Sequence, residues 1–313
     1  MTGDQWLLFR RFRLQRKQRG HLWCNRRVIS VRLGIVVLLA AVPLRAQNVA
    51  AQPTQGAART LLAAVVSAQG RPVVDVGVDE FVVTEGGLPR DVLELHIADY
   101  PLALVLDDRP EVAGGLGAVR AAARRFIQRV GERPVALLRL SDGHQPVATL
   151  DDGRLVALER LASITSGGSD GSAPLDTIAR AGALLKESGA PFSAVIVIAA
   201  APVDATALVR GELLPAILDS GAAVHVVQAQ PSGAATPDTP GTPDLLRLLA
   251  DETRGQFTAI FSSASYDAAL DRLADRLAIE LMVQYLVPAG PSGGDVRVGV
   301  RVPGARVVGL GAR

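Results

Sequence analysis

Continuous apolar runs alternate with segments of helical spacing through the middle of the chain. The runs occupy residues 102–106, 135–141, 194–200 and 222–230. A run of this kind is typical of a parallel strand that is covered on both faces. Between them, segments such as 113–130 carry apolar residues at the spacing of a helix. Strands that alternate with helices predict a doubly wound, mostly parallel sheet with helices on both sides.

Both flanks of this central region have a different pattern. Residues 58–98 and 281–313 consist of short β-branched runs between Gly- and Pro-containing turns, which indicates antiparallel strands. Each flank alone has only three or four such runs and would leave an apolar face open to water. We therefore expect the flanks to form one accessory β-sandwich-like unit, with an α/β domain at 99–280 inserted between them.

The N-terminal segment 1–46 is basic and ends with a short apolar run. It has ten Lys or Arg residues and one acid, and the apolar stretch 33–42 is shorter than the about 20 residues that span a bilayer. A basic region, a short apolar region and a small residue, Ala46, are typical of a secretory signal peptide, with an uncleaved membrane anchor as the alternative. Residues 47–57 then form a polar linker. The remainder is expected to be exported, either to the periplasm or out of the cell.

Beyond this leader the chain is acidic. Residues 47–313 have 23 basic and 30 acidic side chains, a net charge of −7, and no basic patch with interleaved aromatic residues. This composition argues against nucleic-acid binding. The single cysteine, Cys24, lies in the leader, so the rest of the chain cannot form a disulfide or a cysteine-ligated metal site.

The first candidate for a site is the loop that follows the apolar run at 102–106. This loop reads Asp107, Asp108, Arg109, Pro110 and Glu111. Open parallel sheets bind ligands outside the carboxyl ends of their strands, so an acidic loop at this place is a natural candidate. Cofactor motifs do not accompany it. The glycines at 114–117 lack the last glycine of a dinucleotide fingerprint, and the loop 165–172 has no phosphate-binding Lys.

Three longer stretches of the sequence are informative because of their order along the chain. They are GRPVVDVGVDEFVVTEGGLPRDVLEL at 70–95, LLRLLADETRGQFTAI at 245–260 and the closing segment 276–313, which includes Gln284, Tyr285 and Pro288. Together these stretches resemble segments of the bacterial von Willebrand factor A-related proteins, with Arg254 in place of a family glycine. The resemblance extends over nearly all of 59–313. It implies a von Willebrand factor A-like central domain with an accessory β unit.

The resemblance also implies a metal-ion-dependent adhesion site, built from an Asp-x-Ser-x-Ser loop, a Thr on a second loop and an Asp on a third. Here Asp107 fills the first position, while Arg109 and Glu111 replace the two serines. Ser172 falls at the Thr position. The third acid is missing, because the chain reads Ala-Ala-Ala-Pro at 199–202.

Arg109 is the most consequential of these replacements. A guanidinium is always charged and repels a divalent cation at close range. We expect Arg109 to pair with Asp107 or Glu111 in the place of the metal, which leaves a degenerate site without a metal or any other cofactor.

The expected function is an exported, non-enzymatic module that binds a protein partner of unknown identity. The binding residues are predicted to be Asp107, Asp108, Arg109, Glu111 and Ser172. One alternative is a magnesium-dependent adhesion module with a rearranged cluster that uses Asp108, Glu111 or Asp170.

A second alternative is a hydrolase or phosphatase. Asp107 would then be the nucleophile, but the partner acid expected two residues later is Arg109. The histidines outside the leader lack an evident triad partner, and they are His96, His144 and His225. The phrase LSDG at 140–143 resembles the missing third metal loop but follows the wrong strand, so Asp142 is predicted to be a turn residue.

Overall fold

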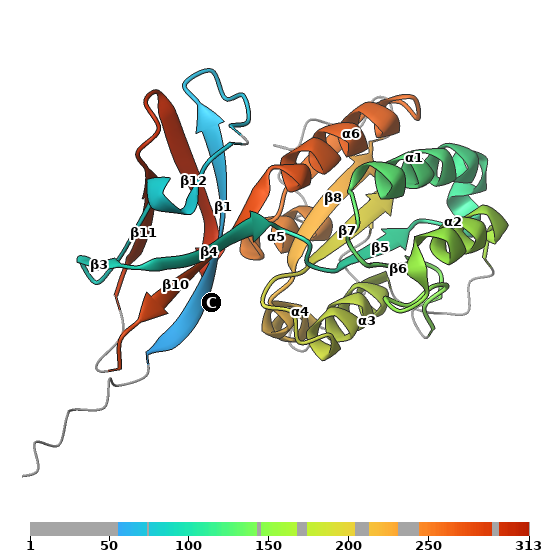
Figure 1. Ribbon diagram of the computed structural model, residues 1–313. Helices are drawn as coiled ribbons and strands as arrows, with labels where there is room; N and C mark the ends of the chain where they lie inside the picture. Colours follow the sequence, from blue (N-terminus) through green and yellow to red (C-terminus); the bar gives the residue numbers. More distant parts are fainter. Residues whose placement is uncertain are drawn as a thin grey trace, which may run out of the picture. The chain divides into compact units, whose positions relative to one another are not determined.

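Three β-sheets organise the part of the chain that the computed structural model describes (Figure 1). The described residues are 56–73, 75–142, 145–167, 174–203, 213–230, 244–289 and 294–312. Residues Ala51–Arg313 cluster as a single unit. The predicted leader and most of the predicted linker therefore lie outside the described residues.

The central sheet has five strands in the order β6-β5-β7-β8-β9. Their bounds are Leu102–Leu106 for β5, Val135–Arg139 for β6, Ala194–Ala199 for β7, Ala223–Ala229 for β8 and Phe257–Ile260 for β9. Every neighbouring pair is parallel. The chain leaves β5 toward β6 on one side and returns to β7 on the other. The carboxyl ends of β5 and β7 therefore form the topological switch point, where such sheets bind ligands.

Helices cover both faces of this sheet, which confirms the predicted fold class. The helices are α1 (Leu116–Arg129), α2 (Gly153–Ser163), α3 (Pro174–Glu187), α4 (Leu213–Ser220), α5 (Leu245–Glu252) and α6 (Ser265–Ala278). Figure 1 shows α1 and α6 on one side of the sheet and α3 and α4 on the other. Because side chains alternate along a strand, Leu104 of β5 joins the α1 and α6 core, whereas Ala103 joins the core with α3.

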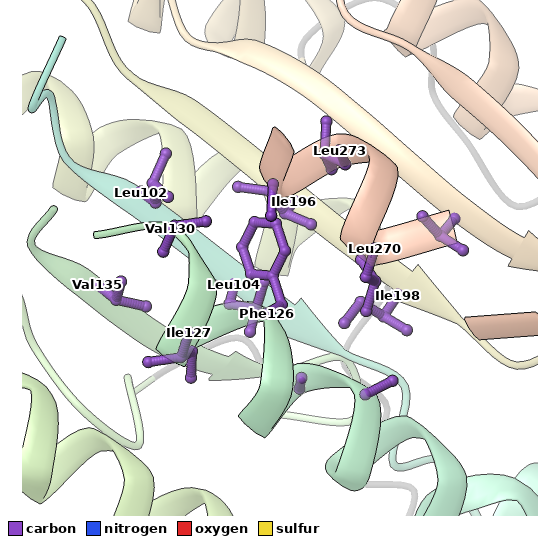
Figure 2. Close-up of a cluster of buried hydrophobic side chains, with 14 of the residues drawn as sticks. Leu102, Leu104, Phe126, Ile127, Val130, Val135, Ile196, Ile198, Leu270 and Leu273 are labelled. Carbon is purple, nitrogen blue, oxygen red and sulfur yellow. The ribbon is translucent and has the colours of Figure 1, made fainter. Parts of the chain in front are cut away.

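Phe126 of α1 lies at the centre of the first of these cores (Figure 2). Leu104 of β5, Ile196 of β7 and Leu270 of α6 surround it, and its side chain is 0% exposed. Burying an aromatic side chain of this size contributes about 1.5–3 kcal/mol. The packing holds α1 and α6 against the strands whose ends carry the candidate site.

The other two sheets are antiparallel and combine the two flanks of the sequence. One has the order β12-β1-β10-β4, with β1 at Ala57–Ser67, β4 at Val92–Ile97, β10 at Glu280–Val287 and β12 at Ala305–Ala312. The other has the order β11-β2-β3, with β2 at Phe81–Glu85, β3 at Leu88–Arg90 and β11 at Val296–Val300. Leu61, Phe81 and Val283 belong to one core that these sheets share. The predicted accessory unit is confirmed, while the exact domain boundaries stay predictions.

Two local features complete the description. The described part of α4 is Leu213–Ser220, and residues 204–212 before it lie outside the described part. None of the helices in the described ranges is long and apolar enough to cross a bilayer.

Candidate functional site

The candidate loop begins at Asp107, directly after β5 and at the switch point. The backbone N–H of Asp107 donates to the carbonyl of Ile198 in β7 at 3.0 Å, so the parallel pairing continues one residue beyond the strand. Pro110 then opens a short 3-10 helix, Pro110–Gly115, and Arg109 is its extended N-cap residue. Extended backbone is the usual conformation before a proline. The loop therefore turns sharply within two residues of the strand end.

Arg109 folds back onto Asp107 and binds it with two N–H groups. Nε donates to Asp107 Oδ1 at 2.8 Å and Nη2 donates to Oδ2 at 2.8 Å. The backbone N–H of Ala200, just after β7, adds a third donor to Oδ2 at 2.8 Å. The Asp107 side chain is 0% exposed and that of Arg109 is 21% exposed. Of the two predicted partners of Arg109, Asp107 and Glu111, the structure confirms Asp107, in the bidentate geometry that makes such pairs strong.

Asp108 points to the other side, toward β6. Its Oδ1 accepts the backbone N–H of Ser141 at 2.9 Å, and its Oδ2 accepts the Ser141 hydroxyl at 2.7 Å. Its backbone carbonyl accepts the N–H of Gly167 at 2.9 Å. A Cβ at Gly167 would collide with both Ser141 and the Asp108 carboxylate, so only glycine fits there. Asp108 therefore ties three loops of the rim together.

Ser141 is a residue that the sequence analysis missed. It lies in the LSDG phrase, where the prediction concerned Asp142 alone. The predicted turn role of Asp142 agrees with its backbone hydrogen bond to the Arg139 carbonyl and its ion pair with the Arg139 side chain at 2.5 Å. Arg139 also approaches Asp108 Oδ2 at 3.9 Å. A hydroxyl placed just after the neighbouring strand of the sheet was the available signal for Ser141.

Tyr266 in the first turn of α6 is a second missed neighbour. Its hydroxyl donates to the carbonyl of Ala199 at the end of β7 at 2.9 Å, and the residue is 2% exposed. Burial and the nearby charge of Asp107 raise the pKa of Tyr266, so this phenol stays neutral. Nothing in the local sequence relates Tyr266 to Asp107, because they lie on different elements.

Several predicted site residues fall outside the part that the structure describes. Ser172, Asp170 and His144 lie there, as does the side chain of Glu111. Pro202 is described and exposed. The binding roles predicted for Glu111 and Ser172 stay predictions.

In the described part of this loop cluster, protein donors already bind the carboxylates that a divalent cation would need. Such a cation needs carboxylate oxygens with unused lone pairs and about six oxygen ligands in total. Asp107 and Asp108 already receive N–H or O–H donors at 2.7–2.9 Å on every carboxylate oxygen. The Arg109 guanidinium lies against Asp107, where a ligated cation would have to bind. Among the described side chains, no three His, Cys, Asp or Glu converge in a way that could hold a metal.

Comparisons with solved structures find weak likenesses over large parts of the chain. A von Willebrand factor type A protein from Catenulispora acidiphila is 12% identical, with 84% of this chain and 74% of that chain covered and a TM-score of 0.45. BatB from Bacteroides thetaiotaomicron, a conserved hypothetical protein, is 17% identical over 57% of this chain and 98% of its own, with a TM-score of 0.43. The pilus adhesin SpaC from Lactobacillus rhamnosus GG is 12% identical over 74% of this chain and 47% of its own, with a TM-score of 0.42.

The structural neighbours thus include von Willebrand factor A domains. Likenesses of this size carry no statement about activity, ligand or partner. No protein-family model and no curated protein sequence matches the chain.

Proposed function

We propose that this chain is an exported, non-enzymatic protein-binding module with a degenerate metal site. Its contact surface would be the rim at the carboxyl ends of β5 and β7, used without a divalent cation. The observation that carries the proposal is the bidentate contact between Arg109 and Asp107, with both distances at 2.8 Å. Export rests on the basic leader and the short apolar run of residues 1–46.

The rim has features that suit a protein contact. Arginine is enriched at interfaces, and a side chain that is already held in place loses little entropy when a partner binds. Arg109 is held by Asp107 and still 21% exposed. Pro110 and Pro202, on either side of the switch point, are exposed and conformationally restricted. A partner would therefore meet a preformed surface.

The same contacts speak against catalysis by these acids. A nucleophile or general base needs a lone pair directed at the substrate. Asp107 is 0% exposed and would have to release both Arg109 and the Ala200 N–H before it could react. Asp108 is equally buried and would have to release Ser141.

Calorimetric titration with Mg²⁺ and Mn²⁺ tests the metal-free part of the proposal. The wild type is expected to show no saturable heat, because binding would require the guanidinium to leave Asp107. The variant Arg109→Ser exposes the carboxylate and is expected to acquire weak binding. Arg125→Ser, which removes an exposed ion pair with Asp271, is the matched control. Saturable wild-type binding that disappears in Asp107→Asn would favour the magnesium-dependent alternative instead.

Site-directed photo-crosslinking tests the surface itself. A photoreactive residue at Pro202 is expected to capture a partner, and the yield is expected to fall when Arg109→Glu reverses the local charge. The same probe at Leu155 of α2, which is 82% exposed, serves as the control position. Equal yields at both positions would contradict the proposed surface. Hydrolysis of generic esters or phosphates that is lost in Asp107→Ala would establish the enzymatic alternative.

A further inference from the structure

A recess lies at the amino ends of the central strands, opposite the loop that begins at Asp107. It has a volume of about 290 Å³ and is lined by residues that precede the strands, including Tyr100 before β5 and Phe192 before β7. Leu62 of β1 and Leu218 of α4 contribute further apolar residues to the wall of the recess. The volume is at the lower end of the range for small-molecule pockets, so a ligand of fragment size would fit.

Two charged residues of opposite sign, both exposed to solvent, also line this recess. They are Glu252, the last residue of α5, and Arg254, two residues later. Neither side chain forms an ion pair with any residue in the described ranges. The recess therefore offers one positive and one negative group next to an apolar wall.

The backbone of Arg254 supports a role for its side chain. The N–H of Gly255 donates to the carbonyl of Ala250 at 2.7 Å, and the N–H of Arg254 donates to the carbonyl of Asp251 at 3.3 Å. This is the Schellman ending of a helix, whose left-handed position glycine usually occupies. Here that position belongs to Arg254, with φ +60°, and Arg254 is the one non-glycine residue with positive φ in the described part of the chain. A strained conformation that persists at a recess suggests that the side chain is needed there.

The apolar wall is rigidly held. The hydroxyl of Tyr100 donates to Glu280 Oε2 at 2.5 Å, and the Arg133 guanidinium stacks on the Tyr100 ring at 4.1 Å. Both partners are buried, with Arg133 at 4% and Glu280 at 2% exposure. The recess therefore exists before a ligand arrives, which lowers the entropic cost of binding.

We infer that this recess binds a small zwitterion with an apolar side group, such as a free α-amino acid. The ligand carboxylate pairs with Arg254, its ammonium group pairs with Glu252, and its side group packs against Phe192 and Leu218. A ligand with a single charge would leave one of the two wall groups unpaired.

Titration of the full chain with L-leucine, followed by ligand-observed NMR, tests this inference. The wild type is expected to bind with a Kd of about 1 mM or below, the range of a fragment-sized ligand. Leucinamide, which lacks the carboxylate, and 4-methylpentanoate, which lacks the ammonium group, are each expected to bind at least tenfold more weakly.

Two variants separate the roles of the charged groups. Arg254→Gly relieves the strained backbone, so it is expected to fold at least as stably as the wild type while its affinity for L-leucine falls at least tenfold. Glu252→Gln is expected to weaken the binding of L-leucine but not the binding of 4-methylpentanoate. Arg272→Gln changes an exposed arginine outside the recess and is expected to bind like the wild type. Absence of wild-type binding, equal binding of leucinamide, or unchanged affinity in a folded Arg254→Gly would each overturn the inference.

Discussion

Two buried carboxylates at opposite ends of the central sheet are stabilised in different ways. Asp107, at the carboxyl end, receives two N–H groups from Arg109 and one from Ala200, all at 2.8 Å. Glu280, near the amino end, receives the neutral hydroxyl of Tyr100 at 2.5 Å, while Arg133 stays at 3.7 Å. The first acid has a close ionic partner within its own loop. The second depends on partners from distant segments.

The difference shows how donor geometry governs a buried charge. Burial raises the pKa of Glu280 above its ordinary value, although the Tyr100 hydrogen bond and the charge of Arg133 act in the opposite direction. Desolvation disfavours a carboxylate unless charged donors lie in direct contact with it. Asp107 has such a donor and Glu280 has only a more distant one. Asp107 thus has a close bidentate ionic contact, whereas the buried Glu280 has a raised pKa.

The largest effect is expected when the ionic contact of Asp107 is broken. Arg109→Ala leaves a fully buried carboxylate with backbone donors only, and we expect a loss of about 3 kcal/mol in the free energy of unfolding. Urea denaturation at pH 7 measures it. The control Arg125→Ala removes an exposed pair with Asp271, so its unfolding midpoint should change little. A loss in Arg109→Ala no larger than in the control would show that the Asp107 contact is not stabilising.

A third buried titratable group is His225, which has no ionic partner among the described residues. It is 3% exposed in β8, and burial, helped by the charge of Arg276, lowers its pKa to about 3. The unfolded state binds a proton below about pH 6.5 and the folded state does so only near pH 3, so stability falls as the pH drops between these values. At pH 4.5 the loss is about 2–3 kcal/mol.

The variant His225→Leu removes this titrating group and should flatten the pH dependence between pH 6.5 and pH 4. His96→Leu, on β4, keeps His225 and should retain the wild-type slope. An unchanged slope in His225→Leu would mean that the ring is protonated or accessible in the folded chain.

A variant of Ser141 tests how much its hydrogen bond to Asp108, at the carboxyl end of the sheet, stabilises the fold. Ser141→Ala removes the hydroxyl that Asp108 accepts at 2.7 Å but leaves the backbone N–H in place. Hydrogen bonds to charged groups contribute about 1.5–3 kcal/mol, so we expect the free energy of unfolding in chemical denaturation to fall by about 1.5 kcal/mol. Ser163→Ala, at the exposed end of α2, is the control. A neutral effect of Ser141→Ala would show that water replaces the hydroxyl.

The smallest effect is expected for Glu280→Gln, which keeps an acceptor for Tyr100 and removes only the charge. The folded pKa of Glu280 is raised, so the folded state binds the extra proton and wild-type stability falls as the pH rises above about 4.5. The variant lacks this dependence, so its stability relative to the wild type should increase as the pH rises from 4 to 8. Thermal unfolding across that range measures the difference, and a constant offset would contradict the raised pKa.

Local sequence was sufficient for the parts of the molecule whose contacts lie close together along the chain. Four strands of the central sheet, β5 to β8, were evident because they lie in mainly apolar runs that are covered on both faces, whereas β9 is only partly buried. The pair between Asp107 and Arg109 was one of the two pairings that the local sequence predicted, because Asp107 and Glu111 each lie two residues from Arg109. The Asp108 contact with Ser141 and the Tyr266 contact with Ala199 were not, because each joins different elements.

The residue order by itself determined the alternation of strands and helices, the antiparallel flanks and the cationic side chain next to Asp107. Only the tertiary structure decided which distant groups meet, such as Tyr100 with Glu280, and which backbone position Arg254 has to adopt. The physical reason is the distance along the chain over which each kind of interaction acts. Periodicity and neighbouring charges act over a few residues, whereas burial brings together groups far apart in sequence and sets how strongly their charges interact.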